Sequence, residues 1–127
     1  MKHKGTAAER ELLKMFWGSN LACIRIAGSG SLPLPCPDLL ASNGTKTFAI
    51  ECKAGNTLPR YITNEQISEL LTFSKMFGAI PLVAYKVPYK GWRFFHPDDL
   101  EKTDKNHIIN HGVLEKKSKF FLDLIKP

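Results

Sequence analysis

The sequence predicts an α/β fold in which a central mixed β-sheet is flanked by helices. Two segments show the apolar spacing of amphipathic helices, and β-prone runs lie between and after them. The predicted order along the chain is helix, strand, strand, strand, helix, strand, strand. A short turn joins antiparallel strands, whereas a helical crossover joins parallel ones, so this order favours a mixed sheet.

Both predicted helices carry a start signal and an apolar stripe. The first is predicted from Thr6 to Trp17, where Thr6 and Glu9 stand at the spacing of a capping box. The second is predicted from Thr63 to about Phe77, with Thr63 and Gln66 in the same pattern and Gly78 as a suitable C-cap. The stripes comprise Ala8, Leu12, Leu13 and Phe16 in the first helix, and Ile67, Leu70, Leu71, Ser74 and Phe77 in the second.

The other segments are predicted to be short strands, turns and loops. Residues 38–41 and 48–53 can form a hairpin around the turn Ser42-Asn43-Gly44-Thr45. The strongly apolar segment 80–87 is expected to be buried on both faces. Further predictions are a strand at 21–27, loops at 28–37 and 54–61, a strand at 92–95, a helical turn at 96–100, and a terminal helix or strand at 120–125. Residues 104–119 show no clear pattern.

Length and composition indicate one folded domain, residues 1–127, with an anionic partner. Of the 127 residues, 43% are hydrophobic, which is enough for one core. No run approaches the roughly 20 apolar residues of a membrane span, and the N-terminus lacks the apolar segment of a signal peptide. The net charge of +6 favours nucleic acid first and a membrane surface second. We expect a nucleic-acid partner and no membrane.

The cysteines favour a reducing compartment. Cys23, Cys36 and Cys52 are odd in number and lack paired spacing, which argues against a disulfide framework or a zinc site. Cys23 and Cys52 fall in apolar strand patterns and are expected to be core residues. The cytoplasm is the simplest location for such a chain.

The most informative motif is Pro37-Asp38, followed after twelve residues by Glu51-Cys52-Lys53. Alternate side chains of a strand point to opposite faces, so Glu51 and Lys53 share one face. Asp38 and Glu51 would meet at one end of the predicted hairpin. Two carboxylates at one point are costly without a cation, and oxygen ligands suit Mg²⁺. The lysine would offset charge on a phosphoryl oxygen, so the motif is typical of a metal-dependent nuclease site.

The same residues also have a purely structural interpretation. Pro-Asp dipeptides are common in turns, and a Glu-x-Lys pair on a strand is often a solvent-facing ion pair. The nuclease interpretation is preferred because the two acids fall on adjacent predicted strands.

Several motifs follow one another in a characteristic order. They are Thr6-Ala7-Ala8-Glu9-Arg10-Glu11, Arg25, Gly28-Ser29-Gly30-Ser31, Pro37-Asp38, Glu51-Cys52-Lys53 and Gln66. Together they resemble the archaeal-type Holliday junction resolvases, which are restriction-endonuclease-like nucleases, up to about residue 95. The resemblance implies a restriction-endonuclease-like fold and a homodimeric endonuclease that cuts opposed strands of a four-way DNA junction. It also implies Mg²⁺ as cofactor, with Mn²⁺ as a substitute.

The resemblance further implies roles for individual residues. Asp38 and Glu51 would hold the metal ion, Glu9 would be a helix-borne acid beside it, Ser29 would be the active-site serine, and Lys53 would be the catalytic lysine. Contacts with DNA are expected from Arg10, Arg25, Ser29, Ser31, Arg60 and Gln66. In one departure from the family pattern, Leu32-Pro33-Leu34-Pro35-Cys36 stands where a lysine-rich loop is expected.

Structural alternatives stay open for four of these residues. Glu9 and Gln66 each fit the fourth position of a capping box, Ser29 fits a turn, and Arg25 fits an ordinary surface charge. The functional alternatives are a nuclease of the same fold that cuts duplex, nicked or flap DNA, and a non-catalytic basic DNA-binding module. The dimer surface is expected to use Phe94, Phe95, Phe120 and Phe121, unless these residues belong to the core.

Overall fold

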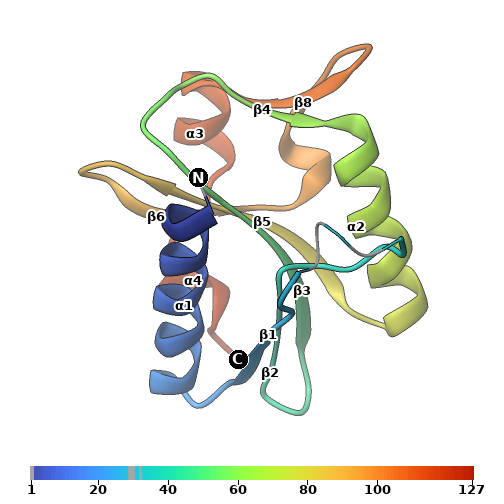
Figure 1. Cartoon of the computed structure of the whole chain (residues 1–127). Coiled ribbons are helices and arrows are strands. Elements are labelled where there is room, and N and C mark those ends of the chain that lie inside the picture. Colours follow the sequence, from blue (N-terminus) through green and yellow to red (C-terminus); the bar gives the residue numbers. More distant parts are fainter. Residues whose placement is uncertain (1, 29–30, 32) are drawn as a thin grey trace.

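A five-stranded sheet lies between helices that cover its two faces (Figure 1). The computed structural model describes residues 2–28, 31 and 33–127. Its elements are α1 (Lys2–Gly18), β1 (Ala22–Arg25), β2 (Leu39–Ser42), β3 (Thr47–Ala54), β4 (Arg60–Thr63), α2 (Asn64–Phe77), β5 (Ile80–Val87), β6 (Gly91–Phe95), the 3₁₀ turn η2 (Pro97–Asp99), β7 (Glu101–Lys102), β8 (Asn106–Ile109), α3 (His111–Lys117) and α4 (Phe121–Leu124). None of the described helices is both long enough and apolar enough to cross a membrane.

The large sheet is mixed, as predicted, with the strand order β1-β2-β3-β5-β6. β3 and β5 are parallel and α2 forms part of their crossover, whereas the other neighbouring pairs are antiparallel. β2 and β3 form the predicted hairpin, with Leu39 opposite Ile50. The side chain of Asn43 closes its turn by accepting hydrogen bonds from the N–H groups of Thr45 and Lys46. The prediction of this hairpin is confirmed.

Two apolar clusters pack against opposite faces of the sheet. On the face covered by α1 and α4, the cluster includes Leu12, Phe16, Phe48, Ile50 and Phe94. On the face covered by α2, it includes Ala49, Ile67, Leu70, Val83 and Tyr85. Because side chains alternate along β3, its even-numbered residues face α1 and its odd-numbered residues face α2. Glu51 and Lys53 therefore extend from the α2 face of this strand.

α1 begins at Lys2, earlier than predicted, so Thr6 lies inside the helix rather than at its N-cap. A capping side chain must bond the unpaired N–H groups at the helix start, and these groups lie a turn before Thr6. The carboxylate of Glu9 and the hydroxyl of Thr6 instead accept hydrogen bonds from Arg25. The capping-box interpretation of Glu9 is therefore wrong.

The predicted caps of α2 are confirmed. The Thr63 hydroxyl accepts a hydrogen bond from the Gln66 N–H at 3.1 Å, and the Gln66 side chain accepts one from the Thr63 N–H at 3.2 Å. Gly78 ends the helix at φ 80°, a left-handed conformation that favours glycine. The predicted apolar stripe is correct for Ile67, Leu70 and Ser74, whereas Leu71 and Phe77 are exposed.

A second, antiparallel sheet has the order β4-β8-β7 and was not among the predicted elements. β4 begins in the segment predicted to be a loop, and β8 lies in the stretch without a clear pattern. Asn64 ties this sheet to the start of α2, because its amide nitrogen donates to the carbonyl groups of Thr103 and Asp104 at 3.0 Å. Its amide oxygen lies 2.6 Å from Nδ1 of His107. Strands of two to four residues show too little alternation for a period to be recognised.

For two of the four phenylalanines proposed for a dimer surface, the alternative of a core position is the correct one. Phe94 and Phe95 are 0% and 1% exposed, because β6 packs one of them into each apolar cluster. Phe121 is partly buried against Phe16, with ring centroids 5.2 Å apart, whereas Phe120 is exposed.

Cys23 is buried in the α1 cluster, and Cys52 is partly buried against it, in agreement with their predicted core positions. All three cysteines are free. Burial raises the pKa of the Cys23 thiol to about 12, and burial together with the charge of Asp38 raises the pKa of Cys52 well above its usual value. Both thiols are therefore protonated at neutral pH and behave as small apolar groups.

Phe16 offers a test of the contact between α1, α4 and the sheet. Its side chain is fully buried, so Phe16→Ala removes apolar contacts and leaves a cavity. We expect the free energy of unfolding in urea to fall by about 3–5 kcal/mol. Lys14→Ala, at an exposed position of the same helix, is the control and should change it by less than about 0.5 kcal/mol. A similar effect of the two substitutions would contradict this packing.

Candidate active site

Asp38 is held between β1 and β3. Its N–H donates to the Ile50 carbonyl at 2.9 Å, and its carbonyl accepts from the Ile26 N–H at 2.9 Å. Its carboxylate oxygen Oδ2 accepts a hydrogen bond from the Cys52 N–H at 2.8 Å. The hairpin therefore fixes both the backbone and the carboxylate of Asp38 beside the peptide that joins Glu51 to Cys52.

Glu51 and Lys53 form an ion pair on one face of β3, as their spacing predicts. Lys53 Nζ lies 3.3 Å from Glu51 Oε2, and the side chains are only 16% and 15% exposed. The alternative of a solvent-facing ion pair fits in part, since the pair exists but is largely withdrawn from water. Taking two charges out of water is costly unless their geometry compensates for the lost hydration.

Glu9 joins this group from α1 through Arg25 of β1. Arg25 Nε donates to Glu9 Oε1 at 2.7 Å, and Arg25 Nη2 donates to the Thr6 hydroxyl at 3.4 Å. The two charged side chains are 22% and 17% exposed. Arg25 therefore links the sheet to α1 and is not an ordinary surface charge.

The charges of the site act on one another. Burial and the charge of Asp38 raise the pKa of Glu51 to about 7, although Lys53 opposes this shift. Burial and Asp38 also raise the pKa of Glu9, against the hydrogen bond from Arg25. Three carboxylates thus share a partly buried region with two cations, and the region carries one surplus negative charge when all are ionised. A bound cation would offset that charge.

The donor chemistry of the site fits a divalent cation. Carboxylate oxygens such as those of Asp38 and Glu51 are the ligands that Mg²⁺ prefers. Over the described residues, no three His, Cys, Asp or Glu side chains are grouped closely enough to form a metal cage, and Glu9 is engaged by Arg25. The arrangement fits Asp38 and Glu51 as ligands, with the charge of Glu9 acting on the same site. A direct metal contact from Glu9 stays a prediction.

Arg60 is placed near the end of β3, though it bonds protein groups. Its Nη1 donates to the Ala54 carbonyl at 3.2 Å, and its guanidinium carbon lies 5.6 Å from the centre of the Tyr85 ring. Tyr85, which sequence analysis missed, pairs in register with Lys53 and donates its hydroxyl to the Thr57 carbonyl at 2.6 Å. Arg60 and Tyr85 therefore fix the loop after β3. An apolar strand pattern gives no signal for this role of Tyr85.

The other predicted DNA contacts are spread over the surface. Arg10 is exposed on α1, Gln66 belongs to the cap of α2, and the Ser31 hydroxyl donates to the Gly28 carbonyl at 2.9 Å. Ser29 lies outside the described residues. Their roles in DNA binding stay predictions.

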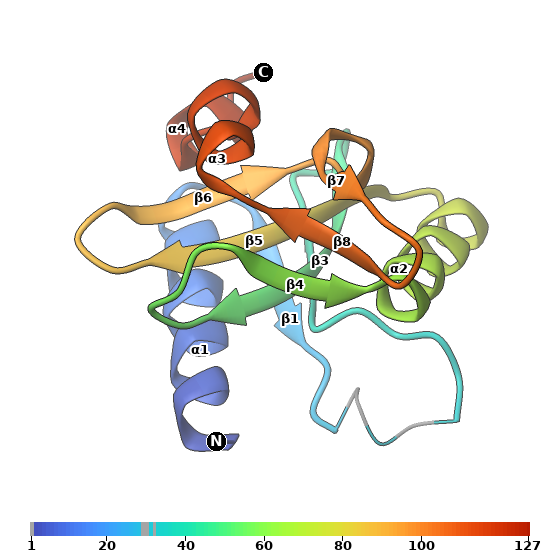
Figure 2. The same ribbon diagram turned by 90° about the horizontal axis from the view of Figure 1, so that it is seen from above.

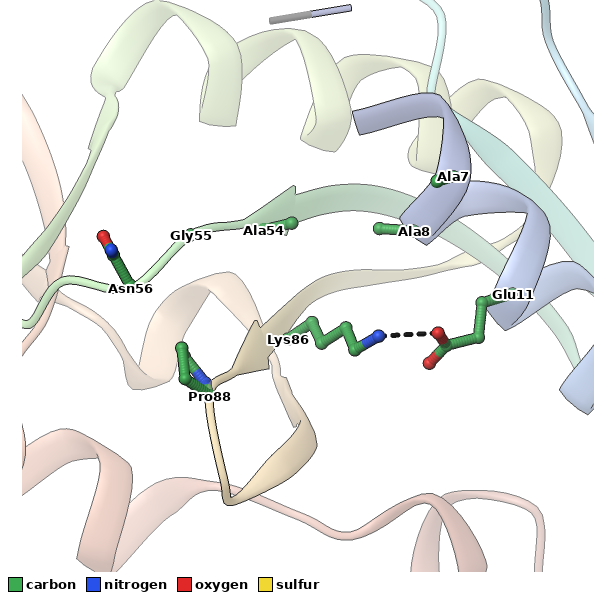
Figure 3. A pocket seen from close by; sticks show the side chains of 8 residues that line it. All are labelled: Ala7, Ala8, Glu11, Ala54, Gly55, Asn56, Lys86 and Pro88. Carbon is green, nitrogen blue, oxygen red and sulfur yellow. Dashed lines mark hydrogen bonds and ion pairs between the residues drawn. The ribbon is translucent and has the colours of Figure 1, made fainter. Parts of the chain in front are cut away.

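A cleft of about 300 Å³ opens on the α1 side of the sheet, at the carboxyl ends of the parallel strands β3 and β5 (Figure 3). Ligands of α/β sheets commonly bind at this end of the strands. Glu11 spans the cleft from α1, with Lys86 Nζ 2.6 Å from its Oε1 and the Trp92 ring N–H 2.8 Å from its Oε2. The cleft is lined by Ala7, Ala8, Glu11, Ala54, Gly55, Asn56, Lys86 and Pro88.

Residues 1–126 match the protein family described as archaeal Holliday junction resolvase (Hjc). The chain belongs to this family. The resemblance inferred from the sequence extends only to about residue 95, whereas the family match continues to residue 126. It therefore also includes β7, β8, α3 and α4.

Two proteins that are similar to this chain are named as crossover junction endodeoxyribonucleases. Crossover junction endodeoxyribonuclease Hjc of Archaeoglobus fulgidus is 48% identical over 89% of this chain and 83% of its own length. Crossover junction endodeoxyribonuclease Hje of Saccharolobus solfataricus is 35% identical over 76% of this chain and 74% of its own length. The prediction of a Holliday junction resolvase, a metal-dependent type of endonuclease, is thus supported.

A solved structure of Archaeoglobus fulgidus Hjc, described as a Holliday junction resolvase from an archaeal hyperthermophile, confirms the resolvase fold. It superposes with a TM-score of 0.89 at 41% identity, covering 94% of this chain and 98% of that one. The predicted α/β fold with a mixed central sheet is therefore confirmed.

The raised pKa of Glu51 predicts a pH-dependent stability of this resolvase family member in EDTA. Between pH about 4.5 and 7, folded Glu51 holds a proton that the unfolded chain has released. Its contribution to stability is present below pH 4.5 and is lost as the pH rises to about 7. Relative to wild type, Glu51→Gln should gain stability through this interval, by at most about 1.4 kcal/mol per pH unit.

Urea unfolding at several pH values measures this difference between Glu51→Gln and wild type. Glu115→Gln, at an exposed position of α3, is the control for removing one carboxylate. A wild-type–variant difference that does not change with pH would contradict the crowding of Glu51 and Asp38.

Proposed function

We propose that the chain resolves four-way DNA junctions by Mg²⁺-dependent hydrolysis of phosphodiester bonds in opposed strands. The proposal is carried by the convergence of Asp38, Glu51, Lys53 and Glu9 at one end of the β2–β3 hairpin, in a member of a resolvase family. Such cleavage returns a recombination intermediate to two separate duplexes.

The protein groups have distinct roles in this proposal. The Cys52 N–H holds the Asp38 carboxylate in place, so that Asp38 and Glu51 are oriented before the cation binds. When bound, Mg²⁺ would lower the pKa of a water molecule and polarise the scissile phosphate. Lys53 would then exchange its partner Glu51 for a phosphate oxygen and offset the charge that develops there.

Arg25 is a positioning residue for Glu9 in this proposal. Its ion pair with Glu9 holds the acid at the edge of the site and ties α1 to β1. The unoccupied sides of its guanidinium can also meet a DNA phosphate, because that group presents five N–H donors. Backbone contacts of this kind do not read sequence, so the preference for a junction must come from its shape.

Charge removal at the proposed metal ligands should abolish cleavage while the protein stays folded. In Asp38→Asn the amide oxygen can still accept from the Cys52 N–H, so the hairpin persists. We expect Asp38→Asn and Glu51→Gln to cut a labelled four-way junction at least about a hundredfold more slowly, a loss of roughly 3 kcal/mol of transition-state stabilisation. Junction binding in EDTA should persist.

Mg²⁺ should also raise the melting temperature of the wild type, since a ligand that binds only the folded state stabilises it. Asp38→Asn and Glu51→Gln should lose most of this shift, whereas Glu115→Gln should behave as wild type. Rapid cleavage by either site variant at ordinary Mg²⁺ concentration would remove Asp38 and Glu51 from the site.

Two other functions are separated by the same assay. A non-catalytic DNA-binding module would bind the junction and cut nothing at any Mg²⁺ concentration. A nuclease for duplex, nicked or flap DNA would cut those substrates as fast as a junction of matched sequence.

We also propose that the protein is a homodimer in the cytoplasm. A four-way junction is cut in two opposed strands, and each chain supplies one site, so two copies related by a two-fold axis match the substrate. Free cysteines suit a reducing compartment.

The exposed end of α2 is a better candidate for the dimer surface than the phenylalanines first expected. Met76, Phe77 and Leu34 are 85%, 56% and 68% exposed, which is unusual for large apolar side chains that lie together. They border a groove of about 340 Å³ that is lined almost entirely by apolar atoms. The lining residues are Leu34, Pro35, Thr72, Phe73, Met76 and Phe77.

A charge on this surface should separate the two copies. Met76→Glu places a carboxylate at the most exposed of these apolar positions, and burying it in a dimer would be costly. We expect analytical ultracentrifugation to show a wild-type dimer and a folded Met76→Glu monomer. Tyr61→Glu, at an exposed tyrosine of β4, is the matched control and should remain dimeric. A dimeric Met76→Glu protein would exclude this surface, and a monomeric wild type would exclude the homodimer.

A further inference from the structure

Arg60 faces into the molecule from β4. Side chains alternate along a strand, and the next residue on the same face of β4, Ile62, is buried in the apolar cluster on the α2 face of the large sheet. β4 thus lies over the face from which Glu51 and Lys53 extend (Figure 2). A charged side chain in such a position needs partners, because water no longer surrounds it fully.

The guanidinium of Arg60 is held next to Lys53. Its Nη1 donates to the carbonyl of Ala54, the residue after Lys53, at 3.2 Å, and its carbon lies 5.6 Å from the centre of the Tyr85 ring. Tyr85 is paired in register with Lys53, and both side chains extend from the α2 face of the sheet. Neighbouring strands lie only about 4.8 Å apart, so Arg60 is positioned beside the proposed active site.

The charge of Arg60 has no anionic partner among the described residues. Lys53 is paired with Glu51, whereas none of the ion pairs in this part of the chain includes Arg60. Its bond to the Ala54 carbonyl uses one of the five N–H donors of a guanidinium. A partly buried cation without a carboxylate has lost hydration and gained no ion pair in return. A phosphate group would supply the missing charge.

Gly55 leaves the space that the guanidinium occupies. A Cβ atom at this position would lie 2.9 Å from Arg60 Nη1 and 3.6 Å from the Tyr85 hydroxyl oxygen. Gly55 is not among the glycines with a positive φ, so its backbone conformation is open to other residues. The close approach of Arg60 therefore explains the glycine. The Tyr85 hydroxyl fixes the same loop by donating to the Thr57 carbonyl at 2.6 Å.

We infer that Arg60 binds a backbone phosphate next to the scissile one, and that Tyr85 and Gly55 fix its guanidinium for this contact. A guanidinium presents parallel N–H donors that match two phosphate oxygens. Lys53 meets the scissile phosphate in the proposed function, so the cation beside it meets a neighbouring phosphate of the same strand. This contact holds the DNA against the metal site and does not read sequence. The inference rests on the proposed function and gives the expected DNA contact of Arg60 a specific place.

A neutral phosphate in the DNA tests this contact directly. Four-way junctions would each carry one methylphosphonate, which lacks the negative charge, at successive positions next to the scissile phosphate. At one position we expect wild-type cleavage to slow at least about tenfold, the effect of losing one charge-assisted contact. Arg60→Ala should cut the unmodified junction at a similarly reduced rate, and the same methylphosphonate should slow it no further. Arg93→Ala removes another arginine that lies over an aromatic ring, and it should keep the full effect of the modification.

Further variants test the positioning of Arg60. Gly55→Ala displaces the end of a flexible side chain, so its melting temperature should stay close to that of wild type while cleavage slows as in Arg60→Ala. The double variant should be no slower than Arg60→Ala. Gly18→Ala adds a Cβ atom that has no neighbour within 4 Å, and it should cleave as wild type does. Tyr85→Leu removes the ring beside the guanidinium and should reduce the methylphosphonate effect, a ratio of rates that partial unfolding does not alter.

The outcomes distinguish this inference from the function on which it rests. If wild type resolves junctions and no methylphosphonate effect depends on Arg60, the phosphate site is excluded and the resolvase function stands. Undiminished cleavage by Gly55→Ala, or an undiminished methylphosphonate effect in Tyr85→Leu, would exclude the positioning by that residue. A wild type that cuts no junction at any Mg²⁺ concentration would remove the proposed function, and this inference with it.

Discussion

The hydrogen bonds between Asp38 and β3 are the constraint on which the site depends. The Asp38 N–H is bonded to Ile50, and its carboxylate is bonded to the N–H of Cys52. A one-residue slip of the β2–β3 register would break both bonds and would also transfer Ile50 from the core to the opposite face. The apolar pattern of β3 therefore protects the register, and the register in turn brings Asp38 to Glu51. Core packing and active-site geometry are specified by the same strand.

The crowded charges of the active site destabilise the folded state, and apolar packing elsewhere in the fold offsets this effect. Glu51 and Lys53 are largely buried, and Asp38 lies beside them. The charge of Glu9 also contributes to the raised pKa of Glu51. Replacing these groups with apolar ones would favour folding, since buried ion pairs often stabilise less than well-packed side chains. The crowding of these charged groups suits the binding of a cation and a phosphate. The two apolar clusters on either side of the sheet supply the stability that makes this arrangement possible.

The sequence was sufficient for the parts of the fold that repeat a clear period or carry strong turn chemistry. The β2–β3 hairpin, the caps of α2 and the shared face of Glu51 and Lys53 follow from local pattern. The start of α1 was misplaced because Thr6 and Glu9 match a capping box by spacing alone, while their true partner, Arg25, is distant in sequence. Tyr85 and the second sheet were missed because their contacts are long-range. Local rules succeed where neighbours in sequence make the contact and fail where the tertiary structure decides.

α1 forms ion pairs with strands at two separate positions in the sheet. These two contacts limit how the length of α1 can change. Glu9 reaches Arg25 on β1, while Glu11 reaches Lys86 on β5, on the other side of β2 and β3 in the sheet. One residue inserted between Glu11 and the buried Leu12 would rotate both acids by about 100° relative to the packed face. Both ion pairs would be lost together, although no charged residue had been replaced. Related chains should therefore vary in length at the β2–β3 turn, where Asn43 and Gly44 are exposed, and keep this part of α1 free of insertions and deletions.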